Sequence, residues 1–279
     1  MKTIRVFPGL VLAFAVACGG GGSSPSTAPK LVPAGVIRQA FAKTIAAKTA
    51  RVSMIMEITS PDEKGSITGS GVFDFTGTRG LFTFDFTNIP GTPFSGKIEQ
   101  RIVERVLYMK IPGLGGGTKT WLKLDVDALA KVSGVDLSEL SQLQSQDPTQ
   151  TLAFLEAVSG DVRRLGTGKV RGVETTQYAA TIDIKKAAAT LPEKLRSRIE
   201  SMRTKLHMTS LPIQVWIDAD QLLRRMAMVM DLSSSRIPGA EQGTVKISMD
   251  VFDYGAPVNV KAPPANQVAD FAEVLGSLK

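Results

Sequence analysis

The feature that most constrains this 279-residue chain is an alternation of apolar and polar side chains with a period of two. In the segment 52–58 every second residue is apolar, and Phe82, Phe84 and Phe86 share one face of a later segment. Such alternation is typical of a strand with one buried face, and it predicts about ten strands. They cover residues 52–58, 66–75, 82–86, 97–104, 105–111, 120–126, 161–171, 173–184, 212–219, 222–232 and 243–253.

The period changes to that of an α-helix in four places. In the first of them, apolar side chains recur every three or four residues and basic residues lie outside that stripe. Asp147 followed by Pro148 is typical of an N-cap and a first helical residue, and begins the second helix. Pro192 falls inside the third helix and marks an alternative start. The predicted helices cover residues 33–48, 148–158, 185–204 and 265–276.

Strands that follow one another with mostly tight turns favour an antiparallel meander as the simplest topology. One face of such a sheet must be covered, and the helices can cover it. The predicted fold class is therefore α+β, with a large curved antiparallel sheet that forms an open half-barrel wrapped around helices. About 250 residues remain after the N-terminal segments, and we expect residues 31–279 to form a single domain.

The first 17 residues have the pattern of a signal peptide. Lys2 and Arg5 precede an apolar run over 6–17, which is shorter than the ~20 residues that a membrane-spanning helix needs. Small residues come directly before Cys18, the only cysteine of the chain, as in the lipobox of bacterial lipoproteins. We therefore expect residues 1–17 to be removed and Cys18 to carry an acyl group such as palmitate. The alternative is an ordinary secretory signal followed by an incidental cysteine.

Residues 18–30 are rich in Gly, Ser and Pro and lack large apolar side chains, which predicts a flexible tether after the lipidated cysteine. The predicted location is the cell membrane, with the chain lipid-anchored on its extracytoplasmic face. Removal of Lys2 and Arg5 with the signal would lower the formal net charge from +7 to +5. The basic residues are scattered without interleaved aromatic residues, so no nucleic-acid partner is expected.

No constellation of catalytic residues is found in the sequence. His207 is the only histidine, and its place near the end of a basic helix favours a solvated imidazole. The pairs Asp218 with Asp220, and Asp250 with Asp253, are more typical of turns in which carboxylates bond backbone groups than of a cation site. We therefore expect neither an enzyme, nor a metal site, nor a cofactor.

Methionine is concentrated on the apolar faces of the predicted strands, where branched residues are more usual. Met226, Met228 and Met230 alternate in one strand, and Met54 and Met56 share a face of another. Methionine adapts to variable apolar partners, and an acyl chain without fixed shape needs such a pocket. The alternative is an ordinary core. The predicted lipid-binding cavity comprises Met54, Met56, Ile58, Phe73, Phe75, Phe82, Phe84, Met109, Ile217, Met226, Met228, Met230 and Met249.

Three segments carry a resemblance to a known family: VWIDADQLLRRM at 215–226, GSGVFD at 69–74 and VKAPPANQV at 260–268. With the order of lipobox, tether, helix and strands, they resemble the LolA-like lipoproteins of actinobacteria, the LppX and LprG group, over residues 31–276. The resemblance implies an open half-barrel with a hydrophobic cavity that carries lipids or lipidated glycans at the cell envelope. It implies no catalytic residues.

Two functions are compatible with these patterns. The first is a lipid carrier with membrane lipids or glycolipids as partners, together with an envelope transporter or acceptor protein. The second is a non-carrier interaction or stress-sensing protein of the envelope on the same fold. A packed interior would favour the second function, and an apolar cavity the first.

Overall fold

The computed structural model describes residues 30–32, 34–61, 63–75, 77–89, 95–104, 106–113, 119–125, 162–189, 193–232, 243–271 and 274. The predicted signal peptide, Cys18 and the predicted helix over 148–158 lie outside these residues. Lys30, the last residue of the predicted tether, is the first residue of a strand. The first described element is therefore a strand, and not the helix that the sequence predicts as the first folded element.

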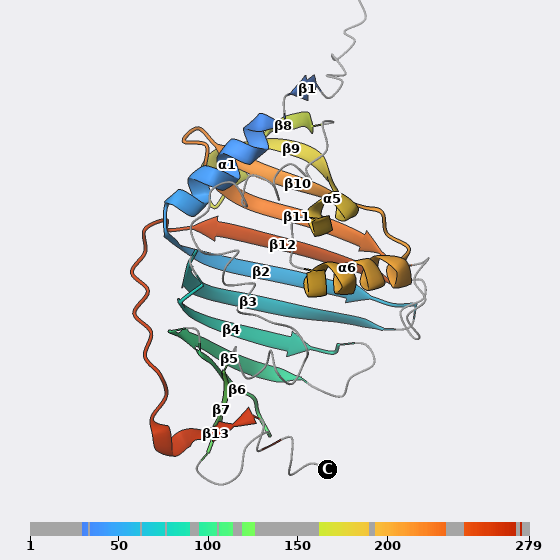
Figure 1. Cartoon of the computed structure of the whole chain (residues 1–279). Coiled ribbons are helices and arrows are strands. Elements are labelled where there is room, and N and C mark those ends of the chain that lie inside the picture. The colour runs from blue at the N-terminus through green and yellow to red at the C-terminus, as the bar shows by residue number, and fades with distance from the viewer. Residues whose placement is uncertain are drawn as a thin grey trace, which may run out of the picture.

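In the described part of the chain, thirteen strands form one open sheet, whose arrangement can be followed in Figure 1. Their order across the sheet is β1-β8-β9-β10-β11-β12-β2-β3-β4-β5-β6-β7-β13, so β1 and β13 are the two edges. The predicted large antiparallel sheet is confirmed, and among the described strands only β7 and β13 form a parallel pair. The strands are β1 Lys30–Val32, β2 Thr49–Thr59, β3 Lys64–Asp74, β4 Arg79–Thr87, β5 Gly96–Val103, β6 Val106–Lys110, β7 Trp121–Asp125, β8 Val162–Val170, β9 Val173–Asp183, β10 Ser210–Asp218, β11 Leu223–Asp231, β12 Thr244–Phe252 and β13 Val268–Asp270.

The sheet consists of two meanders and not of one, which corrects the predicted topology. Strands β2 to β7 form the first meander, β8 to β12 form the second, and β12 pairs with β2. Residues 126–161 separate β7 from β8 in the sequence, so the chain has the length to return to the other side of β2. The pairing of β12 with β2 places Met249 opposite Met54, and the apolar faces of the two meanders become continuous.

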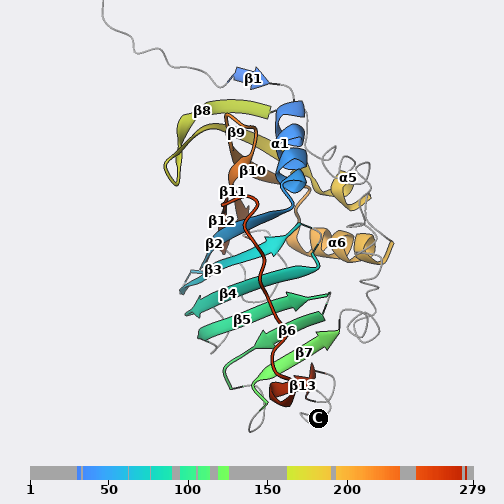
Figure 2. The same cartoon turned by 90° about the vertical axis from the view of Figure 1, so that its left-hand side faces the viewer.

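All three described α-helices lie on the same side of the sheet, as Figure 2 shows. They are α1 Gly35–Ala46, α5 Ile184–Ala189 and α6 Glu193–Leu206. The predicted helix over 33–48 is thus confirmed in its central part. The predicted helix over 185–204 is two helices, and the second begins at Glu193, directly after the alternative start that Pro192 marks in the sequence.

The predicted helix over 265–276 is wrong over most of its described part. A single 3-10 turn at Ala265–Gln267 leads into β13, which runs parallel to β7. Ala269 lies opposite Leu122, and both are buried. A strand of three residues is too short to show a period of two, and the apolar residues of this segment also fit a helical period.

The buried core lies between α1, the strands of the second meander and the adjoining strand β2. Ile37 and Ala40 of α1 are fully buried against Ile213 and Val215 of β10 and Val52 of β2. These are small or branched apolar residues, which pack with few alternative rotamers. We call the part of the sheet beneath α1 the covered region.

Candidate functional site

The strand register places apolar residues in rows across one face of the sheet. Residues directly opposite each other in neighbouring antiparallel strands share a face. One such row runs from Met226 through Met249, Met54 and Gly69 to Phe84. Val215 of the covered core pairs with Met226, so this row lies on the same face as α1. We call this side of the sheet the helix-side face.

Every predicted cavity residue shares this face, either by its register or by its packing. Phe75 lies just beyond the end of β3, and its ring centroid is 4.9 Å from that of Phe73. The others lie within the strands: Met54, Met56, Ile58, Phe73, Phe82, Phe84, Met109, Ile217, Met226, Met228, Met230 and Met249. Their role in lipid binding remains a prediction.

The helix-side face divides into two regions that differ in burial. Ile217 belongs to the buried core, where it is 5% exposed. The methionines on the middle strands are only half-buried. We call this second part the methionine region, and it comprises Met54, Met56, Met226, Met228, Met230 and Met249.

Phenylalanine rings continue the methionine region across β3 and β4. The rings of Phe82 and Phe84 stack with centroids 6.0 Å apart and planes 11° apart. They lie against Gly71 and Gly69, where an added Cβ would come within 2.6 Å and 2.8 Å of ring carbons. Each glycine therefore leaves the space that a flat-lying ring fills.

The sequence analysis missed several residues of the same face. Ile247 lies between Met228 and Met56, and Ile67 lies between Met56 and Phe86. The alternation was visible in each strand separately. The pairing of Ile247 with Met56 depends on the junction of β12 with β2, which the predicted single meander does not contain.

The aspartates that could have formed a cation site are used in other ways. Asp218 accepts a hydrogen bond from the Leu222 N–H at 2.8 Å, and Arg224 Nε lies 2.6 Å from its other carboxylate oxygen. Arg225 binds both carboxylate oxygens of Asp250, at 2.6 and 2.9 Å. The predicted turn role of Asp218 is thus confirmed. Among the described residues no group of acidic, His or Cys side chains could hold a metal ion.

The predicted solvated imidazole is also confirmed. His207 follows α6 with a positive φ of 52°, and its side chain is exposed. Its backbone N–H donates to the carbonyl of Thr204, which closes the helix.

No described helix is long and apolar enough to cross a membrane.

A polar cluster fixes α1 to the end of the covered region. The buried Thr44 hydroxyl accepts a hydrogen bond from the Leu223 N–H at 3.0 Å, and the Tyr254 hydroxyl donates to the Leu223 carbonyl. Burial raises the pKa of Tyr254, while Thr44 and the positive charge of Arg224 act against that shift. This cluster joins α1, β11 and the segment after β12.

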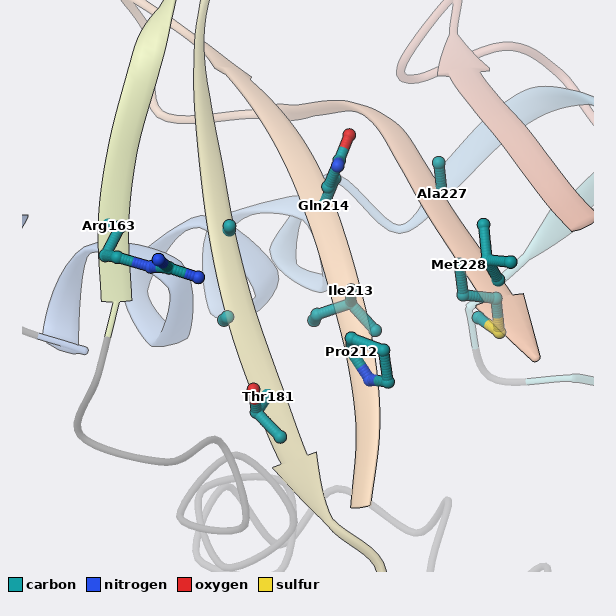
Figure 3. A pocket seen from close by; sticks show the side chains of 10 residues that line it. Arg163, Thr181, Pro212, Ile213, Gln214, Ala227 and Met228 are labelled. Atoms are coloured by element: carbon teal, nitrogen blue, oxygen red, sulfur yellow. The ribbon is translucent and has the colours of Figure 1, made fainter. Parts of the chain in front are cut away.

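A groove of about 300 Å³ lies on the opposite face of the sheet, which Figure 3 shows. Its floor is a row of residues that pair across β8 to β11, namely Arg163, Ala179, Gln214 and Ala227. Val229 also lines the groove and is 48% exposed. The described part of the chain therefore has apolar side chains on both faces, half-buried in the methionine region and exposed at Val229 on the opposite face.

The chain is similar to proteins of two streptomycetes, although no family model matches it. It is 25% identical over 260 residues to an uncharacterised 31.2 kDa protein of Streptomyces griseus. That alignment covers 88% of this chain and 81% of the relative. It is 26% identical over 164 residues to a candidate lipoprotein of Streptomyces coelicolor. This second alignment covers 58% of this chain and 46% of the relative. The chain thus spans less than half the length of the second relative.

Among solved structures, the chain is similar to LolA-like lipoproteins of actinobacteria. LprF from Mycobacterium bovis has a TM-score of 0.47 and 18% identity, over 82% of this chain and 96% of that one. The lipoprotein LppX of Mycobacterium tuberculosis has a TM-score of 0.43 and 17% identity, over 82% and 97%. LppX is one of the lipoproteins that the sequence resemblance names.

Proposed function

We propose that this chain is a membrane-anchored, extracytoplasmic lipoprotein that binds an acyl lipid or lipidated glycan and carries it at the cell envelope. The bound chain would lie against the methionine region and the phenylalanine rings beside it. One observation carries the proposal: an apolar face that is continuous across both meanders is only half-buried in its middle. Monomeric soluble proteins rarely expose apolar patches of this kind unless the patch binds something.

The chemistry of the methionine region suits an acyl chain. Burial of apolar surface contributes about 0.8 kcal/mol per CH₂, so a long acyl chain needs no specific polar contact to be held. Met54, Met228 and Met249 each have rotatable, unbranched side chains that can follow the shape of a variable ligand. Lipid selectivity would then depend on groups outside this region.

The proposed anchor is an acyl group on Cys18, with the following Gly- and Ser-rich residues as a tether. A tethered domain remains near the membrane from which it takes its lipid. An envelope transporter or acceptor protein would receive the lipid, because a carrier must release what it binds.

Two adjacent residues of β11 give a matched test of the proposal. Met228 points to the helix-side face and Val229 to the opposite face, since successive strand residues alternate. Met228→Glu should lower the uptake of a fluorescent fatty acid by at least tenfold, because a carboxylate would enter the apolar site. Val229→Glu introduces the same charge on the opposite face and should leave uptake within about twofold, since that face binds no acyl chain in the proposal.

Circular dichroism and thermal unfolding of both variants would verify that each is folded. Equal uptake by the wild type and by a folded Met228→Glu variant would contradict the proposal. Loss of uptake in both variants would point to a general effect of the added charge, and would also count against a site on the helix-side face.

The groove on the opposite face favours a second candidate function, a non-carrier protein that binds an envelope partner. Val229 lines this groove with an exposed side chain, and Ile55 on the same face is 52% exposed. For this function the matched pair gives the reverse result. Val229→Glu would abolish binding of the partner protein. Neither variant would change fatty-acid uptake, because the wild type itself would bind no lipid.

A further inference from the structure

One end of the molecule carries a concentration of positive charge. Strands β1 and β8 and helix α1 lie together at the top of Figure 1, far from β13 and the C-terminus. From residue 30 to residue 56 the sequence has no acidic residue, and the same holds from residue 162 to residue 173. The basic residues that these stretches place on β1, α1 and β8 are Lys30, Arg38, Lys43, Arg163, Arg164 and Lys169, while Lys48 directly precedes β2, Arg51 lies near its start and Arg171 follows β8.

Most of these charges are not neutralised by neighbours. Arg51, Lys169 and Arg171 form salt bridges with Asp253, Glu174 and Asp250. The others whose side chains are described form no salt bridge with any described residue. They are Arg38, Lys43, Lys48, Arg163 and Arg164, and all except Arg38 are exposed.

The strand register gathers part of this charge at the edge of the sheet. Lys30 of β1 lies opposite Arg164 of β8, and Leu31 lies opposite Arg163. Arg163 and Arg164 are consecutive strand residues, so their side chains point to opposite faces. The edge is therefore positive on both sides of the sheet.

Protection of a sheet edge explains only some of these residues. Charged side chains, lysine above all, prevent edge strands from pairing with other chains. Arg38 and Lys43, however, lie on α1, which has no strand edge to protect. Helix α1 lies at the same end of the molecule and carries two basic residues but no acidic residue. This composition indicates a surface that faces negative charge.

The short stretch of sequence between the proposed anchor, Cys18, and strand β1 keeps this end of the molecule near the membrane. This step rests on the proposed function, in which Cys18 is acylated. Lys30 follows Cys18 by twelve positions, a chain that spans at most about 40 Å when extended and roughly 20 Å as a flexible coil. Strand β1 is thus the described element nearest in sequence to the membrane anchor.

We infer that the basic end formed by β1, α1 and β8 binds the anionic headgroups of the membrane in which the chain is anchored. The tether alone would hold the domain near the membrane without orienting it. The basic end adds an orientation, with β8 toward the membrane and β13 away from it. Each basic residue near an anionic surface strengthens binding by about fivefold at physiological salt.

The experiment uses the chain from residue 18 onward with Cys18→Ser, which keeps every described element and removes the acyl anchor. Its binding to vesicles of phosphatidylcholine with phosphatidylglycerol is compared with its binding to phosphatidylcholine alone. We expect binding to the anionic vesicles only, and a steady decrease as salt is added. The double variant Arg163→Gln/Arg164→Gln should weaken this binding by about 25-fold.

A matched control removes two positive charges elsewhere. Lys97 and Lys110 are exposed residues of β5 and β6, in the other meander. Lys97→Gln/Lys110→Gln lowers the net charge by the same amount, and we expect vesicle binding within about threefold of the wild type. Equal weakening in the two double variants, or a wild type that binds both vesicles alike, would overturn the inference.

Lipid occupancy, measured by native mass spectrometry on the same proteins, separates this inference from the proposed function. Unchanged occupancy together with weakened vesicle binding in Arg163→Gln/Arg164→Gln supports both. Vesicle binding that depends on the two arginines in a protein that never holds lipid would support the basic end and contradict the carrier function. A wild type that holds lipid but does not bind anionic vesicles would support the carrier function and contradict the membrane-binding role of the basic end.

Discussion

The covered region and the methionine region lie on the same face of one sheet, yet they use different residues. Beneath α1 the face consists of Ala, Val and Ile, and Ile213 is 2% exposed. From the neighbouring strand β11 onward it consists mainly of Met and Phe, and Met228, directly opposite Ile213, is half-buried. Branched residues fix one packing arrangement, whereas methionine tolerates many. One face can therefore hold the fold in one region and leave the other free to accept a ligand.

The largest difference is expected when the two cross-strand partners are truncated in turn. Ile213→Ala should lower the free energy of unfolding by about 3 kcal/mol, because it opens a cavity in a packed core. Met228→Ala should lower it by less than about 1 kcal/mol, since its side chain is only half-buried. Urea unfolding of both variants measures the two values. Equal losses would contradict the division into two regions.

The ion pair at the end of the covered region should matter nearly as much. Asp218→Asn removes the charge that neutralises Arg224 but keeps an oxygen for the Leu222 N–H. The Asp218 side chain is only 4% exposed, so we expect a loss of about 2 kcal/mol. Asp253→Asn removes an exposed partner of Arg51 and serves as the control, with a loss below about 0.5 kcal/mol.

The fit of phenylalanine to glycine can be tested with a single methyl group. Gly69→Ala would bring a Cβ within 2.8 Å of the Phe84 ring, so the ring must move away from the sheet. We expect a loss of about 1 kcal/mol and lower fatty-acid uptake. Gly168→Ala meets no atom within 4 Å and should be neutral or slightly stabilising. A neutral Gly69→Ala variant would show that the ring does not need this position.

An effect as small as that of Gly69→Ala is expected at Tyr254, whose hydroxyl helps to fix α1. Tyr254→Phe removes the hydrogen bond to the Leu223 carbonyl and should cost about 1 kcal/mol. Because burial raises the pKa of Tyr254 in the folded chain, its contribution is present below the ordinary pKa of about 10 and is lost as the pH rises through the folded value. Urea unfolding at neutral and at alkaline pH measures this loss. The Phe variant should lack it, and an unchanged alkaline slope would contradict the assignment to Tyr254.

The sequence was sufficient for those features that depend on local periodicity. Two-residue alternation predicted the long strands, and it also predicted which methionines share a face, because each strand carries that information by itself. Pairings between distant strands were not predictable in this way. The junction of β12 with β2 and the parallel strand β13 depend on tertiary packing that leaves no periodic signal. Neighbours across that junction, such as Ile247 between Met228 and Met56, were consequently missed.

Lipid occupancy is the measurement that tests the central claim most directly. The chain from residue 18 onward with Cys18→Ser, secreted by its own host and purified without detergent, would be analysed by native mass spectrometry followed by lipid extraction. The account predicts an acyl lipid at near-stoichiometric occupancy, and its loss in the Met228→Glu variant. A protein that is free of lipid, and takes none up when acyl lipids are added, would contradict the account.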